Sequence, residues 1–433
     1  GGAVLAPWWR ERLQSEVLAL GDAAPFSVEV DFGKLHRKVS DDSGIPKTGP
    51  MDRILASHYS YGQGLDPSKV CFDLASSFSA GAGCLGRFVG QLQSYALYVP
   101  TKPRPAKGYG MTLLLHSLSA NYNQYLASKN QSQLGERAGG SLVVTPGGRG
   151  PDGFYAGIAE ADTFETWADV ARHYKVDKGN AVVSGYSMGG FGTYRLLARW
   201  PDLFARGFSV VGAPGSVIDQ LASLRNTPLL LWNSAEDELV NLQTSEAAVA
   251  ANTKAGIRFT EDKFLTADHL TLAANDEYGP GAAFLGAHRV DPNPSRVTYV
   301  VDPSEDNAVA TAVADHAYWV SGLRTRSKGI GTIDVTSGGF GQGSPKVLPV
   351  ATSGGVLTGG EIPAMGFVSR TQQWGPVLTH KPTSGLSLQL TNLRAVTIDV
   401  ARARVSCDAL IAYSTDGPVE LTLAGCGKTL HLR

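Results

Sequence analysis

The stretch VVSGYSMGGFGTY, residues 182–194, constrains the fold of this chain more than any other. An apolar run leads into a G-x-S-x-G motif centred on Ser187, and a plausible helical segment follows. Small residues on both sides of a serine permit a sharp turn between a strand and a helix, with the hydroxyl held clear of the sheet. The stretch therefore predicts a strand, a tight turn and a helix, with Ser187 either a nucleophile or part of a purely structural turn.

The chain around this motif alternates apolar runs with longer helical segments from about residue 86 to 290, as an α/β domain with a mostly parallel sheet requires. A helix is expected over 164–176, with an apolar face made of Phe164, Trp167, Ala168, Ala171 and Tyr174. The expected strands are 94–100, 111–117, 141–146, 181–187, 207–212, 227–233 and 258–266.

The two flanking regions differ from this α/β domain. With 433 residues the chain is long enough for two or three domains. Residues 1–85 form an N-terminal extension, for which we expect a helix over 8–20, a strand over 26–32 and a loop closed by cysteines. Residues 291–433 show short alternating strands and predict a small antiparallel β domain, in which Trp319 and Trp374 are either exposed binding residues or core residues.

Four cysteines stand at positions 71, 84, 407 and 426, without the close spacing of a zinc or redox site. A hairpin turn at Asp416-Gly417 would place Cys407 opposite Cys426, at a separation that a disulfide can bridge. Cys71 and Cys84 would then close a glycine-rich loop. Two disulfides indicate an oxidising compartment, so we expect a secreted protein, the alternative being four unpaired thiols in a cytosolic enzyme.

A serine nucleophile needs a histidine base and a carboxylate that orients the base. After such a turn these partners follow in the order acid, then histidine, at the ends of later strands. The loop after 227–233 offers Glu236, Asp237 and Glu238, of which we favour Asp237. The tripeptide ADH occurs twice, and we favour His269, at the end of the α/β segment, over His316, which lies in the β-rich region.

The reaction also needs donors for an oxyanion. One is expected to be the backbone N–H of Met188, directly after the serine, and the other the N–H of Ser117 or Leu118 in the loop after 111–117. His116 is expected to brace that loop and not to transfer protons.

Charge and motifs exclude several other classes. The chain has 38 basic and 39 acidic residues, so no field favours nucleic acid or an anionic membrane. No apolar run approaches the roughly 18 residues of a membrane span. We expect no cofactor and no metal; the acidic segment 301–306 is interpreted as a solvated turn rather than a calcium site, and the glycine cluster 338–343 as a loop.

Several segments together resemble the α/β-hydrolase superfamily: YALYVP, LLLHS, VVTPGGRG, WADVARHYKVD and the long block around Ser187. Secreted esterases, polyester depolymerases and prolyl-oligopeptidase-type serine peptidases are the branches that they resemble most. The resemblance covers roughly residues 90–280 and implies a hydrolase that uses Ser187, Asp237 and His269. It departs from the family at Ser117, where a glycine usually follows the histidine.

Among such hydrolases we favour one that cleaves a carboxylic ester of a small molecule or a polymer through an acyl-enzyme, because residues 1–85 are too short for the propeller cap of prolyl oligopeptidases. The alternatives are a serine peptidase with the same chemistry and an inert hydrolase core with a binding role. We expect a monomer, in which the C-terminal domain either binds a polymer or covers the rim of the active site.

Overall fold

The computed structural model describes residues 31–39, 47–62, 65–66 and 87–433. The expected N-terminal helix and the pair Cys71–Cys84 lie outside the described residues. So does most of the expected strand 26–32, whose last residue, Phe32, instead begins the short helix α2 (Phe32–His36). A two-stranded ribbon, β2 (Leu65–Asp66) with β3 (Arg87–Phe88), precedes the main domain.

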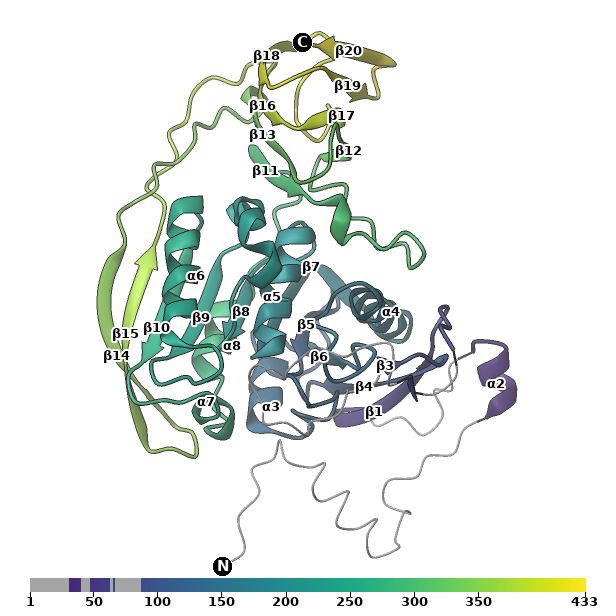
Figure 1. Ribbon diagram of the computed structural model, residues 1–433, viewed down its shortest axis with the longest axis vertical. Helices are drawn as coiled ribbons and strands as arrows, with labels where there is room; N and C mark the ends of the chain where they lie inside the picture. The colour runs from purple at the N-terminus through teal and green to yellow at the C-terminus, as the bar shows by residue number, and fades with distance from the viewer. Residues whose placement is uncertain (1–30, 40–46, 63–64, 67–86) are drawn as a thin grey trace, which may run out of the picture.

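A ten-stranded sheet forms the centre of the molecule, in the order β1-β4-β6-β5-β7-β8-β9-β10-β15-β14 (Figure 1). Its strands are β1 (Gly49–Ala56), β4 (Leu92–Val99), β5 (Tyr109–Leu115), β6 (Ser141–Pro146), β7 (Val176–Tyr186), β8 (Gly207–Val210), β9 (Leu229–Ser234), β10 (Phe259–Phe264), β14 (Ala351–Thr358) and β15 (Ala364–Gln372). All seven expected strands are present. The strands from β6 to β10 pair in parallel, whereas β1, β4, β14 and β15 pair antiparallel, so the sheet is parallel only in its centre.

Helices cover both faces of this sheet, and each face has its own apolar core. On one face lie α4 (Ile158–His173), α5 (Met188–Arg199), η4 (Gly215–Asn226) and α6 (Leu242–Ala255). On the other lie α3 (Lys129–Gly135), α7 (Thr271–Ala274) and α8 (Gly279–Leu285). Among the described residues, none of the helices has the length and apolar character to cross a membrane.

Helix α4 is the expected helix, but it begins six residues earlier. Phe164, Trp167 and Tyr174 of its expected apolar face pack against the core as partly buried side chains. Ala168 is exposed, and the most buried side chains include Glu160 and Asp169. The reason is that α5 offers charged partners: Arg195 and Arg199 both donate to Glu160. Paired in this way, a carboxylate can occupy a position that an apolar residue would otherwise take.

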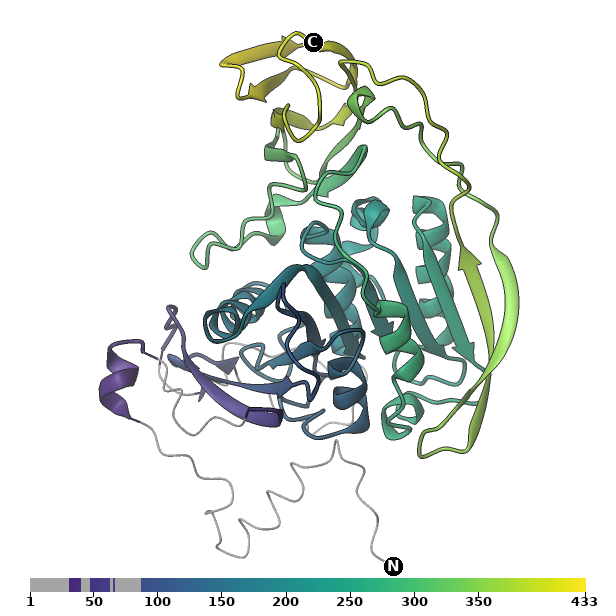
Figure 2. The ribbon, with the colours of Figure 1, turned by 180° about the vertical axis from the view of Figure 1, so that it is seen from behind.

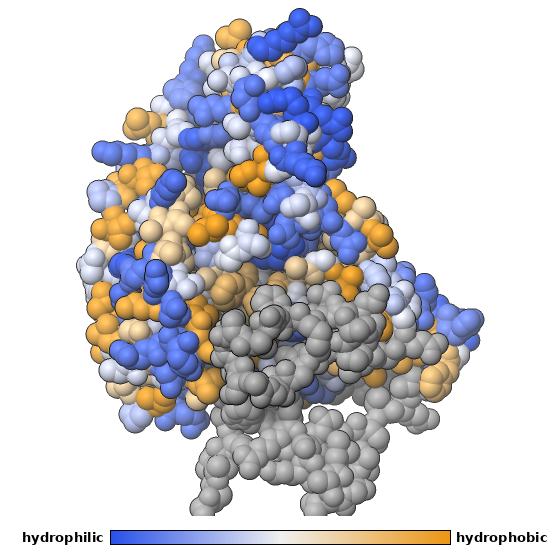
Figure 3. Space-filling model, viewed as in Figure 1, coloured by the Kyte–Doolittle hydropathy of each residue, from blue (hydrophilic) through white to orange (hydrophobic). Residues whose placement is uncertain are grey.

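The C-terminal unit consists of two four-stranded sheets packed around one apolar core. One contains β11 (Arg296–Val301), β13 (Gly331–Ser337), β16 (Gly385–Thr391) and β18 (Leu410–Thr415); the other contains β12 (Val320–Thr325), β17 (Leu393–Asp399), β19 (Val419–Ala424) and β20 (Lys428–Leu432). The expected antiparallel domain is thus wrong in part, because β16 pairs with β18, and β17 with β19, in parallel. Trp319 belongs to the core, and the outer surface seen in Figure 3 is mainly hydrophilic.

The disulfide Cys407–Cys426 is present, with a Cα–Cα distance of 5.5 Å. The hairpin from which it was predicted does not form. Strands β18 and β19 lie in different sheets, so the chain crosses between the sheets at Asp416-Gly417. In a sandwich, strands that are consecutive in sequence can face each other across the core, and their period-two pattern is the same as in a hairpin. The disulfide therefore connects the two sheets.

Both flanking ranges, 1–85 and 291–433, contribute strands to the central sheet. Strand β1 pairs with β4, and the hairpin β14–β15 reaches back from the C-terminal unit to pair with β10 (Figures 1 and 2). An edge strand has unpaired N–H and C=O groups, and an added antiparallel strand satisfies them. The segments 301–306 and 338–343 contain the short helical turns η5 (Pro303–Glu305) and η6 (Gly338–Phe340).

Candidate active site

Ser187 lies in the turn between β7 and α5, with a backbone φ of 55°. A positive φ is rare for a residue with a side chain and stores strain, which places the hydroxyl above the sheet edge. The turn also needs both motif glycines. A Cβ at Gly185 would lie 2.3 Å from the carbonyl oxygen of Gly189, and one at Gly189 would lie 2.0 Å from that of Leu115. Such close contacts exclude any side chain at either position.

His269 and Asp237 complete a hydrogen-bonded array with this serine. The Nε2 of His269 is 2.9 Å from the Oγ of Ser187, and its Nδ1 is 2.9 and 2.8 Å from the two carboxylate oxygens of Asp237. All three residues are buried. The hydroxyl of Tyr186 donates to the carbonyl of His269 and adds a support that the sequence analysis did not identify.

The structure distinguishes the three acids after β9. Asp237 is buried because its Oδ1 accepts the N–H groups of Leu239 and Val240, which turns the carboxylate inward toward the histidine. Glu236 is exposed, and so is Glu238, whose carboxylate accepts only the backbone N–H of His269 at 3.2 Å.

The second ADH tripeptide lies away from the serine. His316 contacts Asp315, with 3.5 Å between Nδ1 and a carboxylate oxygen, and packs edge-on against Trp200 at a ring separation of 5.5 Å. The structure therefore brings His269, and not His316, to Ser187.

The expected oxyanion donors are not equivalent. The N–H of Ser117 donates to the side-chain Oε1 of Gln124 at 2.7 Å, so this expected donor is already occupied. Over the described residues, the N–H groups of Leu118 and Met188 have no such acceptor. Gln124 lies seven residues further along the loop, and nothing in the sequence indicated its contact with Ser117. Of the three expected donors, Leu118 and Met188 therefore remain candidates.

His116 is fully buried beneath this loop. Its Nδ1 is 3.0 Å from the carbonyl oxygen of Ser117 and its Nε2 is 3.1 Å from that of Gly147. Burial lowers the pKa of His116, although its two carbonyl contacts act in the opposite direction, since only a protonated ring can donate to both. These contacts agree with the bracing role expected for it, since the ring joins the end of β5 to the turn after β6.

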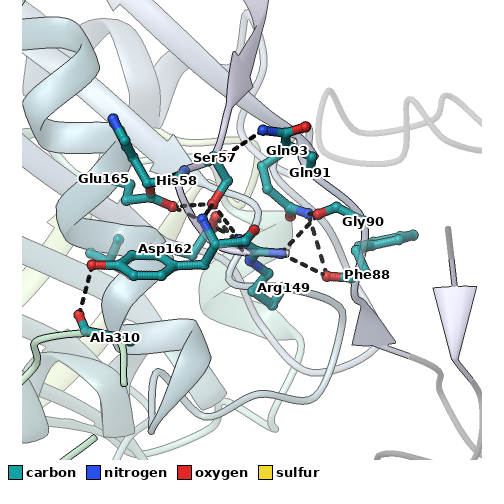
Figure 4. A network of polar contacts seen from close by, with 12 residues as sticks. Ser57, His58, Phe88, Gly90, Gln91, Gln93, Arg149, Asp162, Glu165 and Ala310 are labelled. Carbon is teal, nitrogen blue, oxygen red and sulfur yellow. Dashed lines mark hydrogen bonds and ion pairs between the residues drawn. The ribbon is translucent and has the colours of Figure 1, made fainter. Parts of the chain in front are cut away.

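Arg149 stabilises the turn after β6 through a second set of polar contacts (Figure 4). Its guanidinium is buried, donates to the carbonyl of Gly90 and to Ser57, and lies 3.6 and 3.8 Å from the carboxylates of Asp162 and Glu165. The cluster thus connects β1, α4 and the glycine turn. Burial raises the pKa of Asp162 to about 7, although Arg149 acts in the opposite direction. The sequence analysis gave Arg149 no role.

Within the ranges that the structure describes, no group of three or more His, Cys, Asp or Glu side chains is arranged to hold a metal ion.

No protein-family model matches the chain, and no curated protein matches it significantly. Among solved structures, it is similar to a ferulic acid esterase, with 14% identity and a TM-score of 0.42 over 55% of this chain and 98% of the other. It is also similar to a fluorophosphonate-binding serine hydrolase of Staphylococcus aureus, with 12% identity and a TM-score of 0.42 over 55% of this chain and 99% of the other.

A thermostable esterase is matched with 18% identity and a TM-score of 0.39 over 46% of this chain, which spans 60% of the length of that esterase. Each likeness is confined to about half of this chain.

The arrangement of the elements confirms the expected α/β-hydrolase fold. Ser187 follows β7, while Asp237 and His269 follow β9 and β10, so all three lie at the carboxyl edge of neighbouring parallel strands. This is the chain order and placement that a nucleophile turn of this kind requires.

Proposed function

We propose that the protein is a serine hydrolase that cleaves carboxylic esters. The observation that carries the proposal is the contact of 2.9 Å between His269 Nε2 and Ser187 Oγ, with Asp237 on the opposite side of the ring. A hydroxyl becomes an effective nucleophile when a base at this distance can take its proton.

In the proposed reaction, Ser187 Oγ attacks the carbonyl carbon while its proton moves to His269 Nε2. The C–O bond to the alcohol then breaks, and His269 returns the proton to the leaving oxygen. Water next attacks the acyl-enzyme and gives a proton to His269. The bond between the acyl carbon and Ser187 Oγ then breaks, His269 returns the proton to Oγ, and the acid is released. Asp237 holds the ring and stabilises its charge.

The N–H groups of Leu118 and Met188 are the proposed donors to the oxyanion. The His116 ring and the Arg149 cluster hold the loops from which Leu118 projects, so they act as positioning residues.

Fluorophosphonate labelling followed by intact-mass measurement tests the nucleophile. We expect one adduct on the wild type, one on the control variant Ser304→Ala at an exposed serine, and none on Ser187→Ala. An adduct retained by Ser187→Ala, or none on the folded wild type, would overturn the proposal.

The ester preference needs a separate test because the same groups could cleave an amide bond. We expect short p-nitrophenyl esters to be hydrolysed and aminoacyl-p-nitroanilides to be left intact. Faster cleavage of the anilides would identify a peptidase instead.

We also propose that the enzyme works outside the reducing cytosol. Support comes from the bond Cys407–Cys426, since disulfides persist mainly in oxidising compartments.

A further inference from the structure

A second concave site lies at the opposite edge of the central sheet from Ser187. A cavity of about 360 Å³ is bounded by the residues that directly precede β8, β9 and β10, among them Arg206, Pro228 and Arg258. The C-terminal unit closes another side through Arg296. Trp374, on the segment that returns from β15, also lines it. Figures 1 and 2 show that the two segments flanking β14–β15 run between the central sheet and the C-terminal unit.

The cavity is lined by an unusual number of arginines, and two of them share an aromatic support. The Cζ atoms of Arg225 and Arg258 lie 4.8 and 4.3 Å from the ring centre of Trp374. The indole is itself fixed, because its Nε1 donates to the carbonyl of Gly256 at 2.9 Å. The ring therefore holds both guanidinium groups in place, and the described part of the chain offers their N–H groups no hydrogen-bond acceptor.

Three of these cations have no ion-pair partner among the described residues, although the more distant charge of Asp334 acts on Arg225. Within residues 87–433, no carboxylate lies at ion-pair distance from Arg206, Arg225 or Arg258, and the Nε of Arg258 is buried without a hydrogen bond. Arg206 donates only to the carbonyl of Phe284.

Two further arginines of the lining are neutralised, Arg289 by Asp177 and Arg296 by Asp334. Asp291 is the one carboxylate among the described lining residues.

Holding like charges together in a half-buried position has a cost. Burial lowers the pKa of Arg225 to about 10 and also lowers the pKa values of Arg206 and Arg258. The charge of Arg258 lowers the pKa of Arg206 further. An anion in the cavity would relieve both effects.

We propose that this cavity binds a small molecule that carries at least two oxyanionic groups, either phosphate or carboxylate. A guanidinium group donates two parallel hydrogen bonds to either group, so three unpaired arginines match a ligand with several charges. The volume is in the range of small-molecule sites.

Isothermal titration of the full chain with two probes, pyrophosphate and tricarballylate, tests the proposal at low ionic strength. We expect saturable binding of one molecule per chain of at least one probe, and the stronger of the two identifies the ligand as a phosphate or a carboxylate. Saturable binding of neither probe would overturn the proposal.

Variants separate the cavity from general surface charge. We expect Arg225→Gln/Arg258→Gln to bind about tenfold or more weakly, because hydrogen bonds to charged groups are lost. The matched control Arg104→Gln, at an exposed arginine outside the cavity, should bind as the wild type does. Unchanged affinity in the double variant, with an unchanged unfolding temperature, would contradict the assignment.

A second measurement uses the wild-type chain and therefore does not require any variant to fold. The bound probe should slow modification of Arg225 and Arg258 by phenylglyoxal, mapped by peptide mass spectrometry, and leave Arg104 unaffected. If the probe leaves the modification rates of Arg225 and Arg258 as unchanged as that of Arg104, the proposal is also overturned.

Discussion

Arg149 and Arg258 are withdrawn from water at opposite edges of the same sheet, but their surroundings differ. Arg149 follows β6 at the carboxyl edge and meets two carboxylates, a serine hydroxyl and backbone carbonyls. Arg258 precedes β10 at the amino edge and lies against the face of Trp374, with no hydrogen-bond or ion-pair partner for its guanidinium among the described residues.

This difference separates two uses of a buried cation. A guanidinium whose partners belong to the fold stabilises the geometry around it, whereas one without partners costs folding free energy. We infer that Arg149 supports the proposed catalytic loops and that Arg258 is available to bind a ligand. Each prediction below compares a partnered group with an unpartnered or solvated one.

The largest effect is expected among the acids after β9. Asp237→Asn should lower kcat for ester hydrolysis by about 10⁴-fold, because an amide cannot hold the required form of the His269 ring or stabilise its charge. Glu238→Gln should lower kcat by less than about threefold, since solvent screens an exposed carboxylate. Steady-state kinetics of the two purified variants checks this. Similar losses in both would mean that Asp237 is not the acid.

A smaller effect is expected on stability when the two arginines are replaced. Arg149→Met should lower the free energy of unfolding by about 3–5 kcal/mol, because it leaves buried carboxylates without their cation. Arg258→Met should leave it unchanged or raise it, since an uncompensated charge is removed. Urea unfolding followed by tryptophan fluorescence measures both. A loss at Arg258 as large as that at Arg149 would break the comparison.

The smallest effect is a pH dependence within the Arg149 cluster. Burial raises the pKa of Asp162 to about 7 from 3.8, so the folded state retains a proton that the unfolded chain has lost. The stability that Asp162 contributes is present below pH 3.8 and is lost as the pH rises toward 7.

The free energy of unfolding of Asp162→Asn, relative to that of the wild type, should therefore rise by about 1–3 kcal/mol as the pH increases from 4 to 7.5. Urea unfolding across this range measures the difference. A constant or falling difference would show that the carboxylate stays ionised beside Arg149.

Local sterics explain which features could be predicted from the sequence. The turn at Ser187 depends on glycines two residues away on either side, and continuous apolar runs mark the buried parallel strands. Asp237 could be favoured but not separated from its two acidic neighbours, because the direction of each carboxylate is set by how the loop turns.

Other features depend on contacts between distant segments. The side chain of Gln124 accepts the N–H of Ser117, and the loop that places it there has no periodic pattern. The alternation in β18 and β19 fits a hairpin and a crossing between sheets equally well, so the disulfide was predicted through the wrong connection. The cavity lined by Arg206, Arg225 and Arg258 gathers residues from positions 205 to 377, and no motif could have revealed it.

The path of the hairpin β14–β15 has a consequence for how such a chain can be rearranged. The chain leaves the C-terminal unit, adds two strands beside β10 and then returns to finish the unit. Recombination at a single point near residue 290 would therefore transfer the C-terminal unit together with part of the neighbouring domain's sheet. Exchange of either module intact requires additional junctions on both sides of the hairpin, so the two modules are inherited as one.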